Sequence, residues 1–279
     1  MKSLHVIALD VRLPTGKIFA LLLAGITLVS VALFASHRWW MPQPASQHAP
    51  VLDAQFNWTL INTGIAFVLA QSALAFFVWK FRAQNRNRIK GLGNGVSIAM
   101  VIAVVFISLE LFGAATLGRQ AWASMYSTAP PSNLIRVQAM GQQFAFYFRY
   151  PGPDGQFGPI HVNKIDASVA NYFGLDPAID SASRDDVVTT SLVLPVNRPV
   201  ELVLEAQDVI HSFYVRELRI QQDMVPGMHI PVRFTPTKIG IYEIACTQLC
   251  GLGHYRMRAK LQVMSEAEFQ KWMQAQARP

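Results

Sequence analysis

Three long apolar stretches dominate the first 120 residues of the chain. They run from Ile18 to Ala35, from Thr59 to Trp79 and from Val96 to Leu117. A helix needs about 20 consecutive apolar residues to cross the hydrocarbon core of a bilayer. The pattern therefore predicts a transmembrane region over residues 1–119, with spans at about 18–35, 59–79 and 96–117.

The first stretch has two interpretations. It follows Lys2, Arg12 and Lys17, as either a signal peptide or a membrane span would. Its apolar core is longer than the roughly 7–15 residues usual in signal peptides, and no clean A-x-A cleavage pattern follows it. This favours a retained span, with a cleaved signal peptide as the alternative.

After residue 136 the pattern changes to short segments with β-branched and aromatic residues. Gln138–Tyr150 is predicted as one strand, and residues 151–186 are predicted as loops because they are rich in Gly, Pro, Asp and Ser. Further strands are predicted at Val187–Leu194, Val200–Leu204, Phe213–Val215, Gly227–Phe234, Ile239–Ala245 and Arg258–Val263. Short strands at regular spacing favour a Greek-key β-sandwich.

The fold class predicted is thus a membrane-anchored all-β protein. A linker at 120–136 leads into a β-sandwich at 137–264, and a C-terminal helix occupies 265–279. The helix begins at a capping box, Ser265 to Glu268. Its apolar face, with Phe269, Trp272 and Met273, is expected to pack on the domain or on another subunit.

Charge is distributed unevenly along the chain. The net charge is +7, yet residues 137–264 contain 11 Lys and Arg against 12 Asp and Glu and are close to neutral. Residues 80–90 carry five basic residues and no acid. The excess of basic residues therefore lies in the segments that flank the membrane spans. Because the soluble domain is nearly neutral, we exclude nucleic-acid binding. The positive-inside rule makes this basic loop cytoplasmic, with the N-terminus inside and everything after about residue 119 outside.

The only two cysteines stand in a twelve-residue run that is rich in soft metal donors. Cys246 and Cys250 are followed by His254 and Met257. Thiolate and thioether ligands favour copper, and Met is not an expected zinc ligand. One copper would leave a thiolate over, whereas two coppers bridged by both sulfurs would use both. The alternatives are a disulfide beside packing residues, and a zinc site in which Met257 has no role.

A pair of bridged coppers needs a second imidazole and one more weak ligand. His211, which ends an apolar strand-like run, is the candidate for the second imidazole. The backbone carbonyl of Gln248 is the candidate for the weak ligand. With these residues the sequence resembles subunit II of the cytochrome c oxidase family, whose binuclear CuA centre uses this constellation. The matching segments are Asp208–Phe213, Asp223 with Pro226–Gly227, Arg233–Phe234, Gly240–Tyr242 and Cys246–Met257.

The resemblance implies a cupredoxin-like sandwich and a defined ligand set. Two copper ions would be held by His211, Cys246, the Gln248 carbonyl, Cys250, His254 and Met257. Electrons would come from cytochrome c or a similar soluble carrier and pass to haem in oxidase subunit I. Oxygen reduction and proton translocation would belong to the complex with its other subunits. The chain would lie in the lipid of a bacterial-type inner membrane, with its CuA domain on the periplasmic side.

Two other functions stay open at this point. One is the CuA subunit of a nitric oxide reductase, which only the catalytic partner would distinguish. The other is a membrane-tethered copper chaperone, which would bind copper weakly as mononuclear, exchangeable Cu(I).

Two positions depart from the family pattern. Phe144 occupies the place where the family has a Trp that takes the incoming electron. Gln248 stands where many members have a Glu whose side chain helps to bind magnesium at the interface with subunit I. A neutral amide is a poorer ligand for a hard cation, which counts against a magnesium ion here.

The acidic residues of the domain have two interpretations. They could offer a docking face to a basic electron carrier, or they could be ordinary solvated acids. The candidates are Glu201, Glu205, Asp208 and Asp223.

Overall fold

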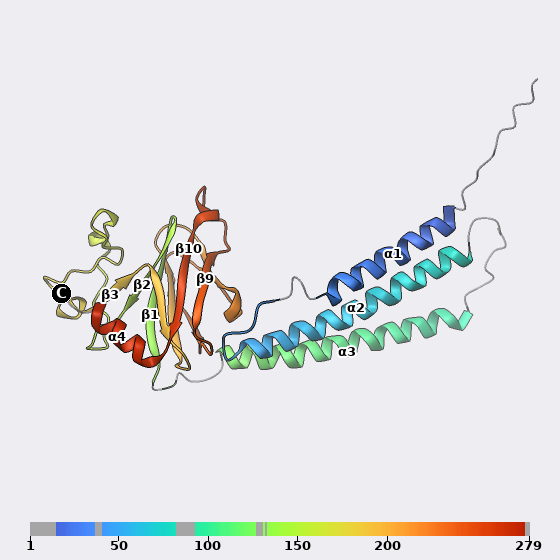
Figure 1. Ribbon diagram of the computed structural model, residues 1–279, viewed down its shortest axis with the longest axis horizontal. Coiled ribbons are helices and arrows are strands. Elements are labelled where there is room, and N and C mark those ends of the chain that lie inside the picture. The colour runs from blue at the N-terminus through green and yellow to red at the C-terminus, as the bar shows by residue number, and fades with distance from the viewer. Residues whose placement is uncertain (1–14, 37–40, 82–92, 127–130, 132, 277–279) are drawn as a thin grey trace, which may run out of the picture. The chain divides into compact units, whose positions relative to one another are not determined.

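The computed structural model describes residues 15–36, 41–81, 93–126, 131 and 133–276. It divides into two compact units, Met1–Trp40 with Phe56–Ala115, and Met41–Gln55 with Thr116–Pro279 (Figure 1). Most of the basic loop predicted at 80–90, the basic residues Lys2 and Arg12, and positions 127–130 of the predicted linker lie outside the described residues.

Three long helices coincide with the apolar stretches. They are α1 (Thr15–Ala35), α2 (Ala49–Lys80) and α3 (Gly93–Tyr126). All three are long and apolar enough to cross a membrane, over Gly16–Ala35, Ala49–Lys80 and Ser97–Ala123. Close approach of α2 and α3 depends on Gly113, because a Cβ there would lie 2.4 Å from the Trp58 ring. Small residues at such contacts are typical of helices that pack within lipid.

Two helices are longer than the spans predicted for them. α2 begins at Ala49, although its apolar stretch begins at Thr59. α3 continues to Tyr126, so the prediction that a linker starts at residue 120 is wrong for its first seven positions. Residues 120–126 contain no Gly or Pro, and their alanines and Met125 are good helix formers. The helix therefore extends beyond the apolar segment.

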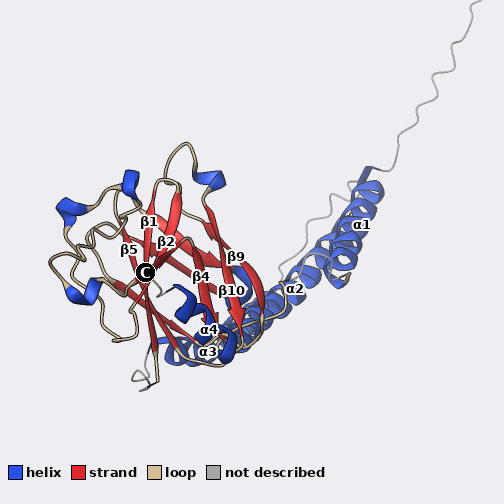
Figure 2. Ribbon diagram, turned by 60° about the vertical axis from the view of Figure 1, so that its left-hand side comes forward, coloured by secondary structure: helices blue, strands red, loops and turns tan. Residues whose placement is uncertain are grey.

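The β domain is a sandwich of two five-stranded sheets, which confirms the predicted fold class (Figure 2). Their strand orders are β3-β2-β1-β5-β8 and β4-β10-β9-β6-β7. The first sheet comprises β1 (Ile135–Gln142), β2 (Ala145–Tyr150), β3 (Val187–Thr189), β5 (Val200–Ala206) and β8 (Ile230–Phe234). The second comprises β4 (Ser191–Pro195), β6 (His211–Val215), β7 (Ile220–Met224), β9 (Gly240–Cys246) and β10 (Arg258–Met264).

Parallel pairing links segments far apart in the chain. β1 is parallel to β5 and β4 is parallel to β10, while all other neighbours within the two sheets are antiparallel. Such crossovers between the sheets are typical of Greek-key sandwiches.

Three strand predictions need correction. Gln138–Tyr150 is not one strand but the hairpin of β1 and β2, which turns at Gln143 and Phe144. Val187–Leu194 divides into β3 and β4, which belong to different sheets. β7 was not predicted, because its three central residues, Gln221, Gln222 and Asp223, are neither β-branched nor aromatic, as strand residues typically are.

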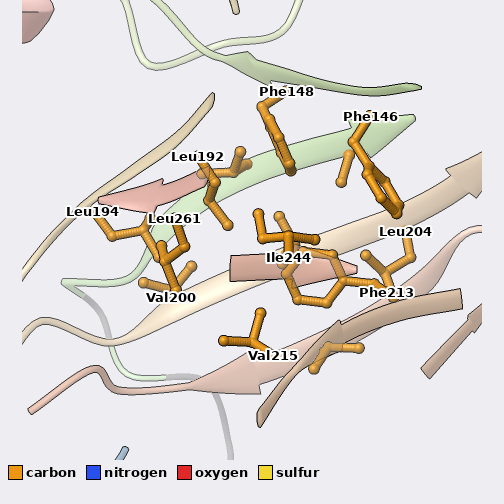
Figure 3. Packing of buried hydrophobic residues seen from close by; sticks show 14 of the residues in the cluster. Phe146, Phe148, Leu192, Leu194, Val200, Leu204, Phe213, Val215, Ile244 and Leu261 are labelled. Atoms are coloured by element: carbon orange, nitrogen blue, oxygen red, sulfur yellow. The ribbon is translucent and has the colours of Figure 1, made fainter. Parts of the chain in front are cut away.

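The core lies between the sheets and contains side chains from both. Figure 3 shows Phe146, Phe148 and Leu204 from one sheet facing Phe213, Ile244 and Leu261 from the other. Phe146 and Phe213 meet edge to face, with ring centroids 6.5 Å apart. This rigid core supports the loops at the end of the sandwich that carry the candidate ligands.

The C-terminal helix α4 (Glu266–Gln276) closes one edge of the core. Ser265 and Glu268 form the predicted capping box: the Ser265 amide donates to Glu268 Oε2 at 3.0 Å, and Ser265 Oγ accepts from the Glu268 amide at 3.3 Å. Phe269 is buried in the core, with Trp272 and Met273 packed against it.

The long insertion between β2 and β3 is held by a buried cation. Arg149 is wholly buried and forms an ion pair with Asp186, which is buried as well. Arg149 also donates to the Gln138 side chain at 3.1 Å and to the Gly158 carbonyl at 2.5 Å. Because Gly158 and Asp186 lie near the two ends of the insertion, Arg149 ties both to the sheet.

Residues 41–55 form part of the same unit as the β domain. The Ala45 amide donates to the Glu217 carbonyl at 2.8 Å, and the Ala45 carbonyl accepts from the Thr237 amide at 2.8 Å. Arg219 donates to both Asp53 carboxylate oxygens, at 2.7 and 3.0 Å, and to the Pro42 carbonyl at 2.6 Å. Residues 41–55, the last seven of which begin α2, thus complete the β domain.

Candidate metal centre

His211 begins β6 with its ring wholly buried. Its Nε2 lies 2.8 Å from Asp208 Oδ1. A carboxylate can only accept, so Nε2 is the protonated nitrogen and Nδ1 has a free lone pair. Nδ1 is buried and has no hydrogen-bond partner among the described residues. A buried acceptor without a partner is costly, and a metal ion is one group that would satisfy it.

The two cysteines lie beside this ring because of strand pairing. Cys246 ends β9 and pairs with Phe213 of β6, two residues after His211. The chain then folds back, and the Cys246 amide donates to the Met257 carbonyl at 3.1 Å. This return places Cys250, His254 and Met257 in the loop between β9 and β10.

The sulfur, nitrogen and oxygen donors of this loop converge. Cys250 Sγ lies 3.8 Å from Cys246 Sγ, 3.7 Å from His254 Nδ1 and 3.9 Å from Met257 Sδ. The Gln248 carbonyl lies 3.2 Å from Cys246 Sγ. Donor atoms of His211, Cys246 and Cys250 all lie within 4.8 Å of one another, and no other such group of three or more occurs in the described part of the chain.

The sulfur atoms belong to two free thiols. Their separation of 3.8 Å is far beyond the roughly 2.05 Å of a disulfide bond. Burial, together with the neighbouring Cys246 thiol, raises the pKa of Cys250 to about 11. Without a metal the Cys250 thiol is protonated at neutral pH, so a cation that binds it must displace its proton.

The turn between β1 and β2 braces the metal-binding loops. The Gln143 side-chain amide donates to the Cys250 carbonyl at 2.6 Å, and the Gln143 backbone amide donates to Asp208 Oδ2 at 2.8 Å. Gly141 makes room for the imidazole, since a Cβ there would lie 2.9 Å from His211 Cδ2. These contacts fix the Asp208–His211 segment against the Cys250 loop.

The side chain of Phe144 covers the same loop. A Cβ on Gly253 would lie 2.4 Å from the Phe144 ring, and one on Gly251 would lie 3.2 Å from it. Phe144 therefore packs directly over the backbone between Cys250 and His254. The position predicted to lie on the electron path is adjacent to the candidate ligands and partly exposed.

Asp208 is an anion held by several donors. Burial raises its pKa, but hydrogen bonds from His211 and from the backbone amides of Gln143 and Val209 outweigh this, so its pKa lies below the usual range. A carboxylate bonded to the second ring nitrogen fixes the tautomer and orientation of a metal-binding His.

Comparison with known proteins identifies the family. The family profile described as cytochrome c oxidase subunit II, periplasmic domain, matches residues 135–264. The alternative cytochrome c oxidase subunit 2 of Bradyrhizobium diazoefficiens is 32% identical over 271 residues, which cover 92% of this chain and 91% of that protein. The chain belongs to the cytochrome c oxidase subunit II family.

A second relative agrees with this assignment. The cytochrome c oxidase subunit 2 of Thermostichus vulcanus is 29% identical over 274 residues, which cover 90% of this chain and 83% of that protein. Among solved structures, the periplasmic domain of cytochrome oxidase subunit II from Bradyrhizobium japonicum covers 53% of this chain and 96% of its own length. Its identity is 23% and its TM-score is 0.39.

Membership of this family implies copper, and the residues present fit that metal. The cluster contains two thiols, two imidazoles and a thioether, which are the soft donors that copper prefers. The unpartnered Nδ1 of His211 points to the same conclusion, because it is the one ring nitrogen that Asp208 leaves available. The family and the apolar helices also indicate a membrane-anchored protein with a periplasmic domain.

The four acidic residues that could form a docking face for a carrier differ in whether their carboxylates already have partners within the domain. Glu201 is buried and accepts from Arg233 at 2.8 Å, with Arg136 at 3.5 Å. Glu205 is buried 3.0 Å from His229. Asp208 is engaged by His211 as described above, and Asp223 lies half-buried in β7 opposite Ser212. Glu201 and Asp208 therefore do not present open carboxylates, because Arg233 bonds to the first and backbone amides bond to the second. Glu205 does not present one because it is buried.

Proposed function

We propose that the chain is the electron-accepting subunit of a respiratory terminal oxidase. It would take electrons from cytochrome c and pass them to haem in subunit I. The observation that carries the proposal is the convergence of six donors, His211, Cys246, the Gln248 carbonyl, Cys250, His254 and Met257, on one buried pair of thiols.

The proposed centre holds two copper ions. The thiolates of Cys246 and Cys250 and the Nδ1 atoms of His211 and His254 would hold them, and Met257 and the Gln248 carbonyl would be the weaker ligands. When bound, such a pair takes up one electron and shares it between two metals. Gln248 contributes its carbonyl only, so the proposal includes no magnesium ion at this position.

The protein's own residues keep this site rigid and dry. Cys246, Cys250 and Met257 are buried, and His211 is fixed by Asp208. All proposed ligands come from the chain, which leaves no open position for a substrate. A rigid ligand shell changes little between oxidation states, and small reorganisation favours electron transfer over bond chemistry. Oxygen reduction and proton translocation would belong to the complex.

We also propose that all three apolar helices cross an inner membrane. The basic residues at 80–90 would then be cytoplasmic and the β domain periplasmic. Asn87→Cys, introduced into the Cys246→Ser/Cys250→Ser chain, supplies a single thiol in the basic loop, and a membrane-impermeant maleimide tests its side. Labelling is expected only after the cells are opened. Labelling of intact spheroplasts would contradict this topology.

The function is tested in the complex assembled around this chain. Cys246→Ser and Cys250→Ser should abolish oxygen uptake driven by reduced cytochrome c. Oxygen uptake driven by a small artificial reductant that reaches the haem directly should persist. Retention of cytochrome c oxidation by both variants would refute the proposal. Loss of uptake with both reductants would show that the variants damage the complex as a whole, and His254→Ala would then replace them in the same comparison.

A further inference from the structure

The loop that carries several candidate ligands is hydrogen-bonded mainly to itself. Residues 247–256 connect β9 to β10, and the loop is closed at its base, where the Cys246 amide donates to the Met257 carbonyl. Among the described residues, Gln143 is the one whose side chain hydrogen-bonds this loop from outside it, through the Cys250 carbonyl at 2.6 Å. The position of Cys250 therefore depends on a residue in another turn of the domain.

The loop leaves room for this side chain at Gly251. A Cβ at this position would lie 2.9 Å from Gln143 Nε2. Gly251 also has a φ of 134°, a backbone conformation that favours glycine. Any side chain at this position would push the Gln143 amide away from the Cys250 carbonyl. The close approach of these two groups thus depends on both segments.

The backbone of the same residue holds the other side of the site. The Gln143 amide donates to Asp208 Oδ2 at 2.8 Å, and Asp208 Oδ1 accepts from His211 Nε2 at 2.8 Å. One residue therefore connects a thiol on the loop to an imidazole on β6. Because the two bonds come from the side chain and the backbone, a substitution can break the bond to Cys250 and leave the bond to Asp208 in place.

The relative position of these ligands matters for two metal ions that share one electron. Sharing requires the two ions to have nearly equal energies, and groups in the outer shell orient the ligands that set those energies. Cys246 is held beside β6 by strand pairing, whereas Cys250 and His254 follow it in the chain, outside that pairing. A shift of the loop would move His254 relative to His211 and make the two ions unequal.

We propose that Gln143 is a positioning residue that keeps the two copper ions equivalent, because it holds the loop that carries Cys250 and His254 in a fixed place relative to His211. The inference rests on the proposed electron-accepting function and deepens it. Gln143 binds no copper itself. It determines how tightly the pair of ions is held and how evenly the unpaired electron is shared between them.

The test compares Gln143→Met with wild type as full chains, purified in detergent and loaded with saturating copper. Met is similar in length to Gln but cannot donate to the Cys250 carbonyl. We expect two coppers per chain to remain, because all six proposed ligands are present. The copper dissociation constant, measured by competition with a chelator, should rise about 10-fold. The EPR hyperfine pattern should change from equal to unequal coupling to the two nuclei.

Gln142→Met is the matched control, because Gln142 lies one residue earlier, on β1 opposite Ala145. It should leave the dissociation constant and the EPR pattern unchanged. Near-ultraviolet circular dichroism shows whether each variant is folded. Gln143→Glu replaces Gln143→Met if the latter does not fold, since a carboxylate has the shape of the amide but no donor. The same rise and the same spectral change are expected.

The outcomes distinguish this inference from the proposed function. If wild type lacks a signal shared by two coppers, the proposed function fails and the inference fails with it. If wild type has that signal and the folded Gln143 variant shows the same EPR pattern, the inference alone fails. A lower unfolding temperature with an unchanged spectrum would identify Gln143 as a residue that supports the fold only. An equal spectral change in Gln142→Met would overturn the inference as well.

Discussion

The residues around His211 determine which of its nitrogens is available to a metal. Asp208 accepts from Nε2 at 2.8 Å, and Gly141 leaves space for the ring. Nδ1 is buried and has no hydrogen-bond partner within the part of the chain that the structure describes. A buried nitrogen without a partner is unfavourable in a metal-free domain. The arrangement therefore favours the metal-bound state and fixes its geometry in advance.

Removal of the Asp208 carboxylate should weaken copper binding. Such orienting partners typically contribute 10- to 100-fold to metal affinity, so Asp208→Ala should raise the copper dissociation constant by about that factor. Asp208→Asn retains an acceptor for Nε2 and should lose less. Affinity is measured by competition with a copper chelator. The control is Asp223→Ala in β7, and equal affinities for Asp208→Ala and this control would contradict the role of Asp208.

Part of this site could be predicted from the sequence, and part could not. The spacing of Cys246, Cys250, His254 and Met257, with the family resemblance, predicted the donors that the fold brings together. Gln143 and Gly141 were missed as supports, since each acts on a residue far away in the chain. The ion pair of Glu201 with Arg233 was not predicted either, because the β5–β8 register that places Arg233 opposite Glu201 cannot be read from one strand.

At the scale of elements, two charged contacts attach segments from outside the two sheets to the sandwich. Arg149 holds the insertion between β2 and β3, and Arg219 holds residues 41–55. The two differ in burial, because the pair of Arg149 with Asp186 is wholly enclosed whereas Asp53 is partly exposed. Their loss should therefore have different consequences.

Arg149→Leu should strongly destabilise the β domain. It leaves Asp186 buried and unpaired, which typically costs about 3–5 kcal/mol. The control is Arg198→Leu, which breaks an exposed ion pair with Glu266 and should cost no more than about 1 kcal/mol. Thermal unfolding of the full chain in detergent is followed by near-ultraviolet circular dichroism. Equal unfolding temperatures for the two variants would show that the Arg149 pair does not hold the insertion.

Arg219→Ala should loosen residues 41–55, which include the first seven residues of α2. It removes the bonds to Asp53 and Pro42, and bonds to a charged group contribute about 1.5–3 kcal/mol. Limited proteolysis should then cut within residues 41–55 sooner than in wild type. Arg216→Ala, which removes an exposed pair with Glu217, should cut at the wild-type rate. Unchanged cleavage in Arg219→Ala would mean that backbone bonds alone hold the segment.

The elements that were mispredicted share a physical cause. The turn at Gln143 and Phe144 has none of the Gly, Pro, Asn or Asp residues that mark turns, so β1 and β2 looked like one strand. β7 is polar because it pairs at a sheet edge, and α3 extends past its apolar stretch because nothing there breaks a helix. Strongly patterned segments were predictable, whereas those decided by tertiary pairing were not.

The whole molecule separates its tasks between two units. The apolar helices and most of the net positive charge belong to the membrane part of the chain. Residues 137–264 are nearly neutral and contain the only two cysteines of the sequence. Residues 41–55 belong structurally to the β domain, so a fragment that begins near residue 120 would lack part of its own fold. Metal binding is therefore best measured on the full chain.

The central claim is that this chain holds two coppers bridged by Cys246 and Cys250. The most direct test purifies the full chain in detergent, loads it with copper, counts metal per chain and records the EPR spectrum. We predict two coppers per chain and one unpaired electron shared by both nuclei, with the signal lost in Cys246→Ser and in Cys250→Ser. One copper per chain, with a single-nucleus signal or none, would contradict the account and favour a membrane-tethered copper chaperone.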